Sequence, residues 1–426
     1  MQSSQIAVKV KEQFGKFLGI FSPRFSKPAL HFVGQMVYGV QASQDVLLSQ
    51  IGRELGESIP LAKVENRLSR NLAREGLADT LHDALLEHAA RHIRKDTLLI
   101  LDPSDIQKEY AVCMPYLAKV WDGSKGKVGD NLGYSGCMAI ACESGARKMV
   151  PLAFRLWSSK APDFLSENHE VETLSDQIEE KAPGRGIRVY DRGGDRIGLF
   201  QHFLAKGQRF IVRLVGKRHL LWHNKRMPAE KLARTCRMLW KSRVSFKSHG
   251  RETTVDIEFG GMDVRLPGDP GAALRLVVVR GFGEAPMMLL TNLAGGDSRE
   301  DLWRVVEGYV TRWRVEEAIR FIKQAYRLEN MRLLDYERLK NMAALVVAAA
   351  HFAAAWMGMG ERLEILRKHI LEMAQRIHEV PEFFYYALAD GIGRLFKRHG
   401  KGWKRTSGVP PPPDPQLRLP FEFAHG

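Results

Sequence analysis

Cysteine is scarce in this sequence, and its four cysteines, Cys113, Cys137, Cys142 and Cys236, are not grouped. No two of them form a Cys-x2-Cys pair, and none stands with histidines at zinc-finger spacing, so the pattern of a structural zinc site is missing. Four scattered cysteines also exclude the dense disulfide framework of a small secreted domain. We therefore expect free thiols in a reducing compartment.

Signals for export, membrane insertion and nucleotide binding are missing as well. The N-terminal stretch MQSSQIAVKVKEQFGKFLGIF lacks the apolar run and the cleavage site of a signal peptide. The apolar residues 342–357 are too few to span a membrane comfortably and are interrupted by His351, which favours a buried Ala-rich helix. Residues 123–136 contain glycine and lysine without Walker-A spacing, and we interpret them as a mobile loop. These absences predict a cytoplasmic protein without a membrane partner.

Positive charge is what the sequence has in excess. It contains 64 lysines and arginines against 49 aspartates and glutamates in 426 residues, which gives a formal charge of +15 and a pI near 9.6. The hydrophobic share of 45% and the charged share of 27% are otherwise ordinary for a globular protein. The excess favours a polyanionic partner, and nucleic acid is the first candidate. A basic protein without such a partner has the same composition.

Hydrophobic spacing predicts helical regions at both ends of the chain. Residues 1–95 carry apolar side chains at helical intervals, mixed with arginines, and either bind the ends of DNA or simply cap the main domain. Residues 346–405 are also predicted to be helical. The Pro-rich segment 406–426 is predicted to be extended or disordered.

The centre of the chain predicts an α/β fold. Within residues 96–216, β-rich runs and helical runs follow the order three strands, helix, strand, helix, strand, which predicts a mixed five-stranded sheet with helices on its faces. Residues 217–297 are β-rich and punctuated by glycine, as expected of an inserted β domain. Residues 298–345 return to the core with a long helix over 298–326, for which Ser298 is the predicted N-cap.

Two aspartates end apolar β runs and are candidate metal ligands. Asp102 ends TLLILD, and Asp191 ends GIRVYD. Strand ends in α/β sheets are common positions for active-site groups, although a single aspartate there more often starts a turn. If the two carboxylates meet, their repulsion needs neutralising, and a pair of Mg²⁺ or Mn²⁺ ions does this with oxygen ligands while activating a water or a 3′-hydroxyl. Asp105, three residues after Asp102, is the alternative first acid.

The long helix carries a polar stripe made of Tyr309, Arg312, Glu316 and Lys323. At 3.6 residues per turn these four lie within roughly 40° of Glu316 around the helix axis. Taken alone, the stripe is better explained by Arg–Glu pairing on a solvated face. The upstream aspartates change that balance in favour of a third acidic ligand, Glu316.

At these residues the sequence resembles a known family. TLLILDPSD (97–105), VYDRGGD (189–195) and the Tyr-x2-Arg-x3-Glu-x6-Lys spacing of the helix are similar to the three blocks of DDE transposases of the insertion sequence 4 family, the group with the Tyr-Arg-Glu-Lys signature. The resemblance covers about residues 95–345 and implies an RNase H-like catalytic domain. It implies that Asp102, Asp191 and Glu316 form the catalytic triad and hold two Mg²⁺ or Mn²⁺ ions.

The resemblance also implies how the chain meets its substrate. Tyr309, Arg312 and Lys323 are expected to contact DNA phosphates, with Arg192 as a further contact. Trp313, or alternatively Trp222, is a candidate for stacking on a displaced base, although each fits equally well as a packing residue.

The function implied is that of an insertion-sequence transposase. Such an enzyme cuts DNA at terminal inverted repeats, joins the 3′ ends to target DNA and works as a homodimer in the synaptic complex, associated with the nucleoid when bound to DNA. The alternatives are a catalytically silent, domesticated DNA-binding protein and a stand-alone metal-dependent nuclease.

Overall fold

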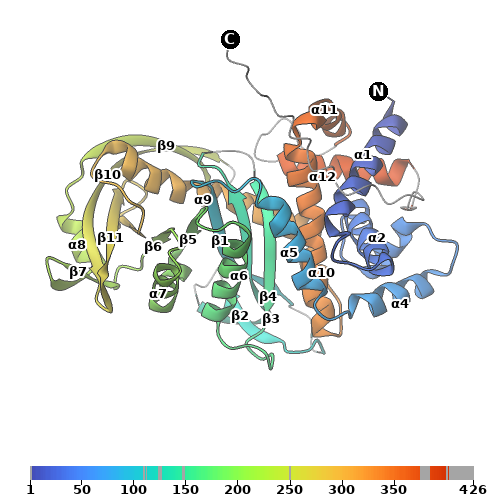
Figure 1. Cartoon of the computed structure of the whole chain (residues 1–426), viewed down its shortest axis with the longest axis horizontal. Helices are drawn as coiled ribbons and strands as arrows, with labels where there is room; N and C mark the ends of the chain where they lie inside the picture. The colour runs from blue at the N-terminus through green and yellow to red at the C-terminus, as the bar shows by residue number, and fades with distance from the viewer. Residues whose placement is uncertain are drawn as a thin grey trace, which may run out of the picture.

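The computed structural model describes residues 2–108, 111, 113–122, 127–145, 149–248, 251–374, 384–399 and 402. Side chains are described for these residues apart from 121–122, 127–130, 246–248, 251–252, 314–318 and 361. The predicted tail 406–426 lies outside these ranges. Figure 1 shows a β-rich part and a helical part on either side of the strands around β1.

In the described part of the chain, twelve strands form one sheet, in the order β2-β3-β1-β5-β6-β12-β11-β10-β7-β8, with β4 beside β3 and β9 beside β10. The strands are β1 (Leu98–Gln107), β2 (Ala118–Asp122), β3 (Lys127–Cys142), β4 (Met149–Trp157), β5 (Ile187–Tyr190), β6 (Phe210–Arg213), β7 (His219–Trp222), β8 (Lys225–Pro228), β9 (Trp240–Ser248), β10 (Arg251–Leu266), β11 (Asp269–Arg280) and β12 (Met287–Thr291). A mixed sheet was predicted and is found, but the predicted number of five strands is too small. The sheet is larger because β12 pairs with β6 and continues it into the β-rich region.

The central part of the sheet has the predicted order of strands and helices. β4, β3 and β1 are antiparallel neighbours, whereas β1, β5 and β6 are parallel and are joined by helical crossovers. The interpretation of residues 123–136 as a loop is wrong for residues 127–136, which belong to β3 and pair with β1 and β2. Residues 123–126 lie outside the described chain.

The main helices are α1 (Ser3–Leu18), α2 (Lys27–Ser43), α3 (Leu48–Leu55), α4 (Leu61–Leu72), α5 (Leu77–Ala89), α6 (Glu167–Lys181), α7 (Ile197–Ala205), α8 (Ala229–Thr235), α9 (Arg299–Ala325), α10 (Tyr336–His351), α11 (Glu364–Glu372) and α12 (Phe384–Arg398). Short helical segments are η1 (Gly19–Phe21), η2 (Arg192–Gly194), η3 (Leu328–Asn330), the π-helical η4 (Phe352–Met357) and η5 (Glu361–Leu363).

Helices cover both faces of the central sheet. Alternate residues of a strand point to opposite faces, so Ile100 joins the core beneath α9 and α10, whereas Leu99 and Leu101 join the core beneath α5, α6 and α7. Both cores are built from fully buried aliphatic and aromatic side chains. This alternation fixes which face each polar residue at the end of a strand must occupy.

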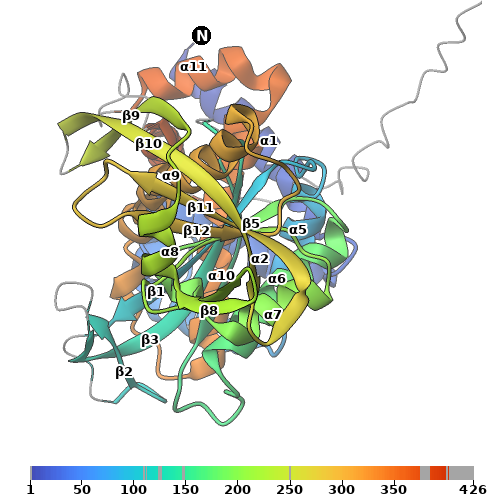
Figure 2. The same cartoon turned by 90° about the vertical axis from the view of Figure 1, so that its left-hand side faces the viewer.

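The β-rich region 217–297 is attached to the core through its strands and through α9. β12 pairs with β6, and Trp303 of α9 packs on Phe259 of β10 with ring centroids 5.8 Å apart. Figure 2 looks at the molecule from this end, with β9, β10 and β11 nearest the viewer. The insertion and the first half of α9 therefore form one packed unit.

The helices at the two ends of the chain pack together into one helical module, which consists of α1–α5 and α10–α12. Phe14 packs on Phe352 at 5.3 Å, and Tyr38 stacks on Phe396 at 4.6 Å, measured between ring centroids. The predicted boundary at 345/346 falls inside α10, which runs without a break into η4.

The predicted buried Ala-rich helix is confirmed. One helix of the described chain, Tyr336–Met357, has the length and apolarity to cross a membrane, but 89% of its most apolar window is buried inside the protein. It forms the centre of the helical module.

Candidate active site

Asp102 lies in the middle of a strand. β1 continues to Gln107 and stays paired with β3 along its whole length, so the prediction that Asp102 ends the strand is wrong. The pairing of β1 with β5, in contrast, ends at Ile100 and Val189. Asp102 is therefore supported by one neighbouring strand and lies beside the point where the other strand stops.

Asp191 occupies the matching position on β5. It comes two residues after Val189, as Asp102 comes two residues after Ile100, and Ile100 and Val189 are paired in parallel register. Because the side-chain period of a strand is two, both carboxylates lie on the α9 face of adjacent strands, which are spaced about 4.8 Å apart.

The buried thiol of Cys137 lies near both acids. Burial raises the pKa of this thiol well above its ordinary value, and the negative charges of Asp102 and Asp191 raise it further. A Cβ placed on Gly193 would also lie 3.0 Å from Asp191 Oδ1 and 3.9 Å from Pro103 Cγ, which joins the Asp191 turn to the residue after Asp102.

The sequence DRGGD builds the turn that carries Asp191. The Asp191 carboxylate caps η2 by accepting a hydrogen bond from Gly193 N at 2.8 Å. A Cβ on Gly194 would lie 2.5 Å from Tyr190 Cβ, so the turn has room only for glycine there. Asp195, whose side chain is 2% exposed, accepts from Arg218 Nε at 2.6 Å and anchors the turn to the segment after β6.

The helix α9 lies unusually close to the sheet over these strands. It begins as predicted at Ser298, whose hydroxyl accepts from Asp301 N at 3.1 Å. Glycine at position 308 permits the close approach, since a Cβ there would lie 2.9 Å from Ile211 Cδ1. Ile319 and Ile322 of the same helix are buried.

Arg312 connects α9 to the first acid. Its Nη1 donates to Asp102 Oδ1 at 3.1 Å, and the two side chains are 8% and 18% exposed. The Arg312 guanidinium also lies 5.4 Å from the centroid of the Tyr309 ring. Tyr309 is fully buried, and its hydroxyl has no hydrogen-bond partner among the described atoms.

Lys323 holds the end of β1 from the same helix. Its Nζ donates to the backbone carbonyl of Asp105 at 2.8 Å, and burial lowers its pKa. Asp105 lies three residues after Asp102 in a regular strand, so its side chain lies on the other face of the sheet. The geometry thus favours Asp102 over Asp105 as the acid that faces α9.

Glu316 lies in α9, one turn after Arg312. Positions four apart are neighbours on one helix face, so position 316 follows position 312 along the same face of α9. Its side chain is outside the described residues.

Arg192 and Trp313 lie at the edge of this region. Arg192 is exposed beside Asp191. Trp313 is half-buried and packs edge-on against Phe282 at 4.9 Å and against Tyr309 at 6.1 Å. Trp222 stands apart from them in β7, where its ring contacts His223 at 4.5 Å.

One charged residue that the sequence analysis did not select lies beside the two acids, and with Asp102 and Asp191 it forms a row across three strands. Arg213, the last residue of β6, is next in register to Asp191, because Tyr190 pairs with Val212. The signal was present, since RFIVRLVG is an apolar β run with a charged residue inside its carboxyl end. A cation at the end of a strand, such as Arg213, is also typical of a turn, and it is no candidate for a metal ligand.

The donor set fits a hard divalent cation. Asp102 and Asp191 offer carboxylate oxygens on one face of adjacent strands, which are the ligands that Mg²⁺ and Mn²⁺ prefer. Within the described side chains, which omit Glu316, no group of three or more His, Cys, Asp or Glu residues is placed to hold a metal ion.

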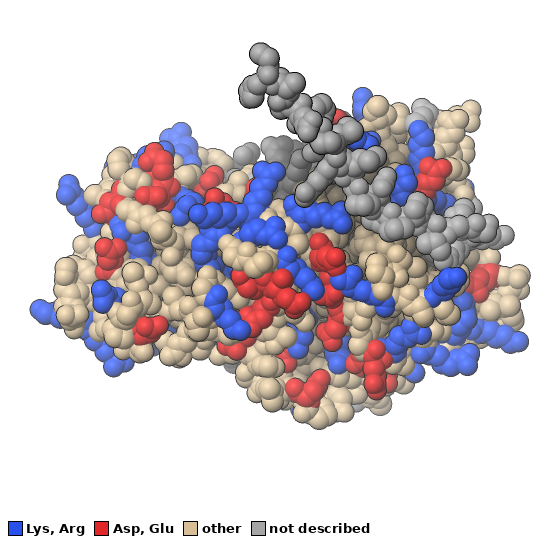
Figure 3. Space-filling model, in the orientation of Figure 1, with Lys and Arg blue, Asp and Glu red and all other residues tan. Residues whose placement is uncertain are grey.

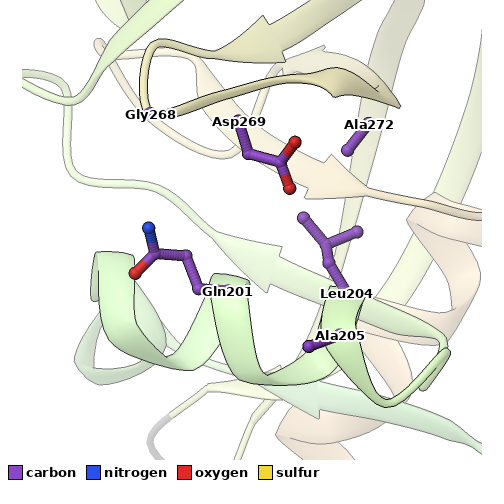
Figure 4. Close-up of a pocket in the computed structure, with 6 residues that line it drawn as sticks. All are labelled: Gln201, Leu204, Ala205, Gly268, Asp269 and Ala272. Carbon is purple, nitrogen blue, oxygen red and sulfur yellow. The ribbon is translucent and has the colours of Figure 1, made fainter.

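Two other surface features lie away from the acidic row. Figure 3 shows acidic side chains gathered over α5 and α6 on the opposite face of the central sheet. Figure 4 shows an open cavity of about 490 Å³ between α7 and the β10–β11 turn, lined by Gln201, Leu204, Ala205, Gly268, Asp269 and Ala272. Its lining has one carboxylate and none of the residues of the row.

A solved structure and a family model are similar to this chain. A cryo-EM structure of the piggyBac transposase synaptic complex with hairpin DNA aligns with 93% of this chain and 80% of that chain, at 12% identity and a TM-score of 0.40. No curated protein matches the sequence. The family model described as "Transposase DDE domain" matches residues 93–352, which include Asp102, Asp191 and all of α9. The chain therefore belongs to the transposase DDE domain family.

Proposed function

We propose that this protein is the transposase of an insertion sequence, of the insertion sequence 4 family, which cuts DNA at terminal inverted repeats and joins the 3′ ends to target DNA. The carrying observation is that Asp102 and Asp191 lie on one face of adjacent parallel strands, with Arg312 of α9 bound to Asp102. The order β4-β3-β1-β5-β6, antiparallel and then parallel, supports an RNase H-like core.

Asp102, Asp191 and Glu316 are the proposed ligands of two Mg²⁺ or Mn²⁺ ions. When bound, such ions supply charge neutralisation and Lewis-acid activation of the attacking water or 3′-hydroxyl. The chain itself contributes rigidity. Asp102 is held within the paired strand β1, and Asp191 is held by the Gly193 amide, so neither carboxylate must be reorganised when DNA arrives.

Arg312 and Lys323 are the proposed phosphate-binding cations of α9, with Arg192 at the exposed rim. A guanidinium offers a planar fork of donors and an ammonium a point charge, and both suit phosphate oxygens. Trp313 is well placed to form an apolar wall beside them, since it is half-buried between Phe282 and Tyr309.

DNA is the proposed partner, bound by a homodimer in the synaptic complex. The formal charge of +15 supports a polyanionic ligand. Because acidic residues cover α5 and α6 on the opposite face, DNA is expected at the carboxyl ends of β1 and β5, on the α9 side.

The test is cleavage of a duplex that carries the end sequence of the element around this gene, with Mg²⁺ or Mn²⁺. Glu316→Gln should abolish cleavage and leave DNA binding largely intact, whereas Glu317→Gln, one residue along the same helix, should cleave like the wild type. Normal cleavage by Glu316→Gln would remove Glu316 from the triad.

The same assay separates the two alternatives. A nuclease would cut without preference for the end sequence and would produce no strand-transfer product. A catalytically silent protein would bind the end duplex and leave it uncut.

A further inference from the structure

Three adjacent strands place a row of charged residues on one face, at the point where the parallel pairing of β1 with β5 and of β5 with β6 stops. Asp102 of β1, Asp191 after β5 and Arg213 of β6 follow the parallel registers β1–β5 and β5–β6 at equivalent positions. With strands about 4.8 Å apart, the Cα atoms of Asp191 and Arg213 are neighbours. Arg213 therefore stands on the opposite side of the acids from Lys323, which holds the outer part of β1.

The Arg213 guanidinium has no carboxylate partner among the described residues. Four other arginines of the sheet are paired with acids: Arg155 with Glu170, Arg188 with Glu179, Arg218 with Asp195 and Arg275 with Asp263. Arg185 and Arg280, which have no such acid, donate to backbone carbonyls. The side chain of Arg213 is half-buried and makes no ion pair or hydrogen bond to any described residue. An uncompensated guanidinium in that setting is costly unless a ligand brings the negative charge.

The Arg213 guanidinium is nevertheless held in place. It lies 6.0 Å from the centroid of the Tyr309 ring, and the Arg312 guanidinium lies 5.4 Å from the same ring. Cation–π attraction to the buried ring restricts the movement of each guanidinium group. Two like charges on one aromatic ring repel each other, and an anion placed between or beside them removes that repulsion.

We propose that Arg213 binds a backbone phosphate of the DNA strand, on the β6 side of the acidic row, with Tyr309 as the positioning residue beneath it. This inference rests on the proposed function. It adds a cation of β6 to the three proposed above, which are Arg312 and Lys323 of α9 and Arg192 in the turn after β5. The DNA backbone then crosses the ends of β1, β5 and β6 in that order. Tyr309 acts through its ring, which is buried, and its hydroxyl has no part in the contact.

Binding of the end duplex, measured against salt concentration, tests the charge. Arg213→Ala should weaken binding roughly tenfold and lower the salt slope by about one phosphate equivalent. Arg213→Lys should keep the slope, because it keeps the charge. The matched control is Arg209→Ala, which removes the same charge from the other end of the β6 segment, where Arg209 pairs with Asp96 at 3.6 Å. It should leave the slope unchanged.

A chemical double-mutant cycle then locates the contact. Duplexes carrying one neutral methylphosphonate are scanned through the phosphates around the cleavage site, with wild type and with Arg213→Ala. At the phosphate bound by Arg213, the wild type should lose affinity and the variant should lose none further.

The outcomes distinguish the two proposals. If the wild type cleaves its end duplex while the losses from Arg213→Ala and from every methylphosphonate simply add, Arg213 contacts no phosphate and the inference is overturned. If the wild type neither binds nor cleaves the duplex, the proposed function fails and the assignment of Arg213 fails with it.

Discussion

The helical module and the charged row on β1, β5 and β6 contain polar groups that differ in whether the chain supplies their hydrogen-bond partners. In the module, Asn341 donates to the carbonyls of Leu72 and Arg74 and accepts from Ala78 N, each at 2.8 Å. In the row, the Tyr309 hydroxyl and the Arg213 guanidinium lack hydrogen-bond partners among the described residues.

The difference separates polar groups that stabilise the fold from polar groups that are left for a ligand. Buried polar groups are normally satisfied, and those that are not call for an explanation such as a missing ligand. In the module, the chain itself satisfies the buried polar groups of Asn341, so these groups stabilise the fold. Under the proposed function, a polyanion and metal ions complete the row, so its groups contribute to recognition at the expense of stability.

The largest expected effect comes from changing an acid of the row. Asp191→Asn should reduce DNA cleavage by at least about a hundredfold, the size typical of removing one preorganised charged group, because a charged ligand is lost. The free energy of unfolding should stay the same or rise, since the amide oxygen still caps Gly193 N and one of two like charges is gone. Cleavage rates and urea denaturation measure the two effects.

The matched control for that variant lies four residues along. Asp195→Asn should lower stability by about 3 kcal/mol, because the Asp195 side chain is buried and its half-buried partner Arg218 loses its counter-charge. Equal destabilisation by Asp191→Asn and Asp195→Asn would erase the distinction between the two aspartates.

In the module the opposite pattern is expected. Asn341→Leu should lower the free energy of unfolding by about 3 kcal/mol, since it leaves two carbonyls and one amide without partners. The cleavage rate of the remaining folded protein should not change. The same substitution at the exposed Asn66 of α4 should cost less than about 0.5 kcal/mol. A stable Asn341→Leu protein with impaired cleavage would contradict the comparison.

Acid should weaken the module before it affects the row. His88 and His351 form a buried pair, with Nδ1 of His88 3.0 Å from Nε2 of His351 and Nδ1 of His351 2.7 Å from the Pro151 carbonyl. Burial lowers the pKa of His88 to about 3 and of His351 to about 4 from the ordinary 6.5. The unfolded chain thus binds protons that the folded chain refuses, so stability is full above pH 6.5 and falls as the pH drops toward 4.

The expected loss is on the order of 2 kcal/mol per imidazole between pH 6.5 and pH 5. Unfolding free energies measured across this range, for wild type and for His351→Gln, give the slope. A slope that is as steep in His351→Gln as in the wild type would show that the pair does not titrate on unfolding.

The smallest effect is expected from a single hydroxyl. Tyr309→Phe keeps the ring and removes a buried hydroxyl without a described partner, so stability and DNA affinity should change by less than about 1 kcal/mol. Tyr326→Phe is the control within the same helical segment, because the Tyr326 hydroxyl donates to Gln41 Oε1 at 2.8 Å, and it should destabilise by about 1–2 kcal/mol. A tenfold loss of DNA affinity in Tyr309→Phe would restore the hydroxyl as a phosphate donor.

Local pattern was enough to predict the elements that carry the site. The apolar runs before Asp102 and Asp191 are strands, and the helix with Ser298 as N-cap begins where its capping residue predicts. These features depend on neighbours in sequence, which the sequence displays directly.

Long-range pairing was not predictable in the same way. No residue close to Asp102 in the sequence indicates that β1 stays paired with β3 as far as Gln107. The pairing of β12 with β6, which enlarges the sheet to twelve strands, and the position of Arg213 beside Asp191 both depend on register between distant segments. Arg213 is also a cation, whereas metal ligands are expected to be acids.

The bond between Arg312 and Asp102 joins residues 210 positions apart, and this has a consequence during synthesis. A ribosome must complete nearly all of α9 before the acids and their cations can meet, because contacts of such separation form only after the intervening chain exists. A product that terminates early within the β-rich region carries both aspartates but none of the α9 cations. Under the proposed function, the growing chain therefore assembles its site only after translation has passed α9.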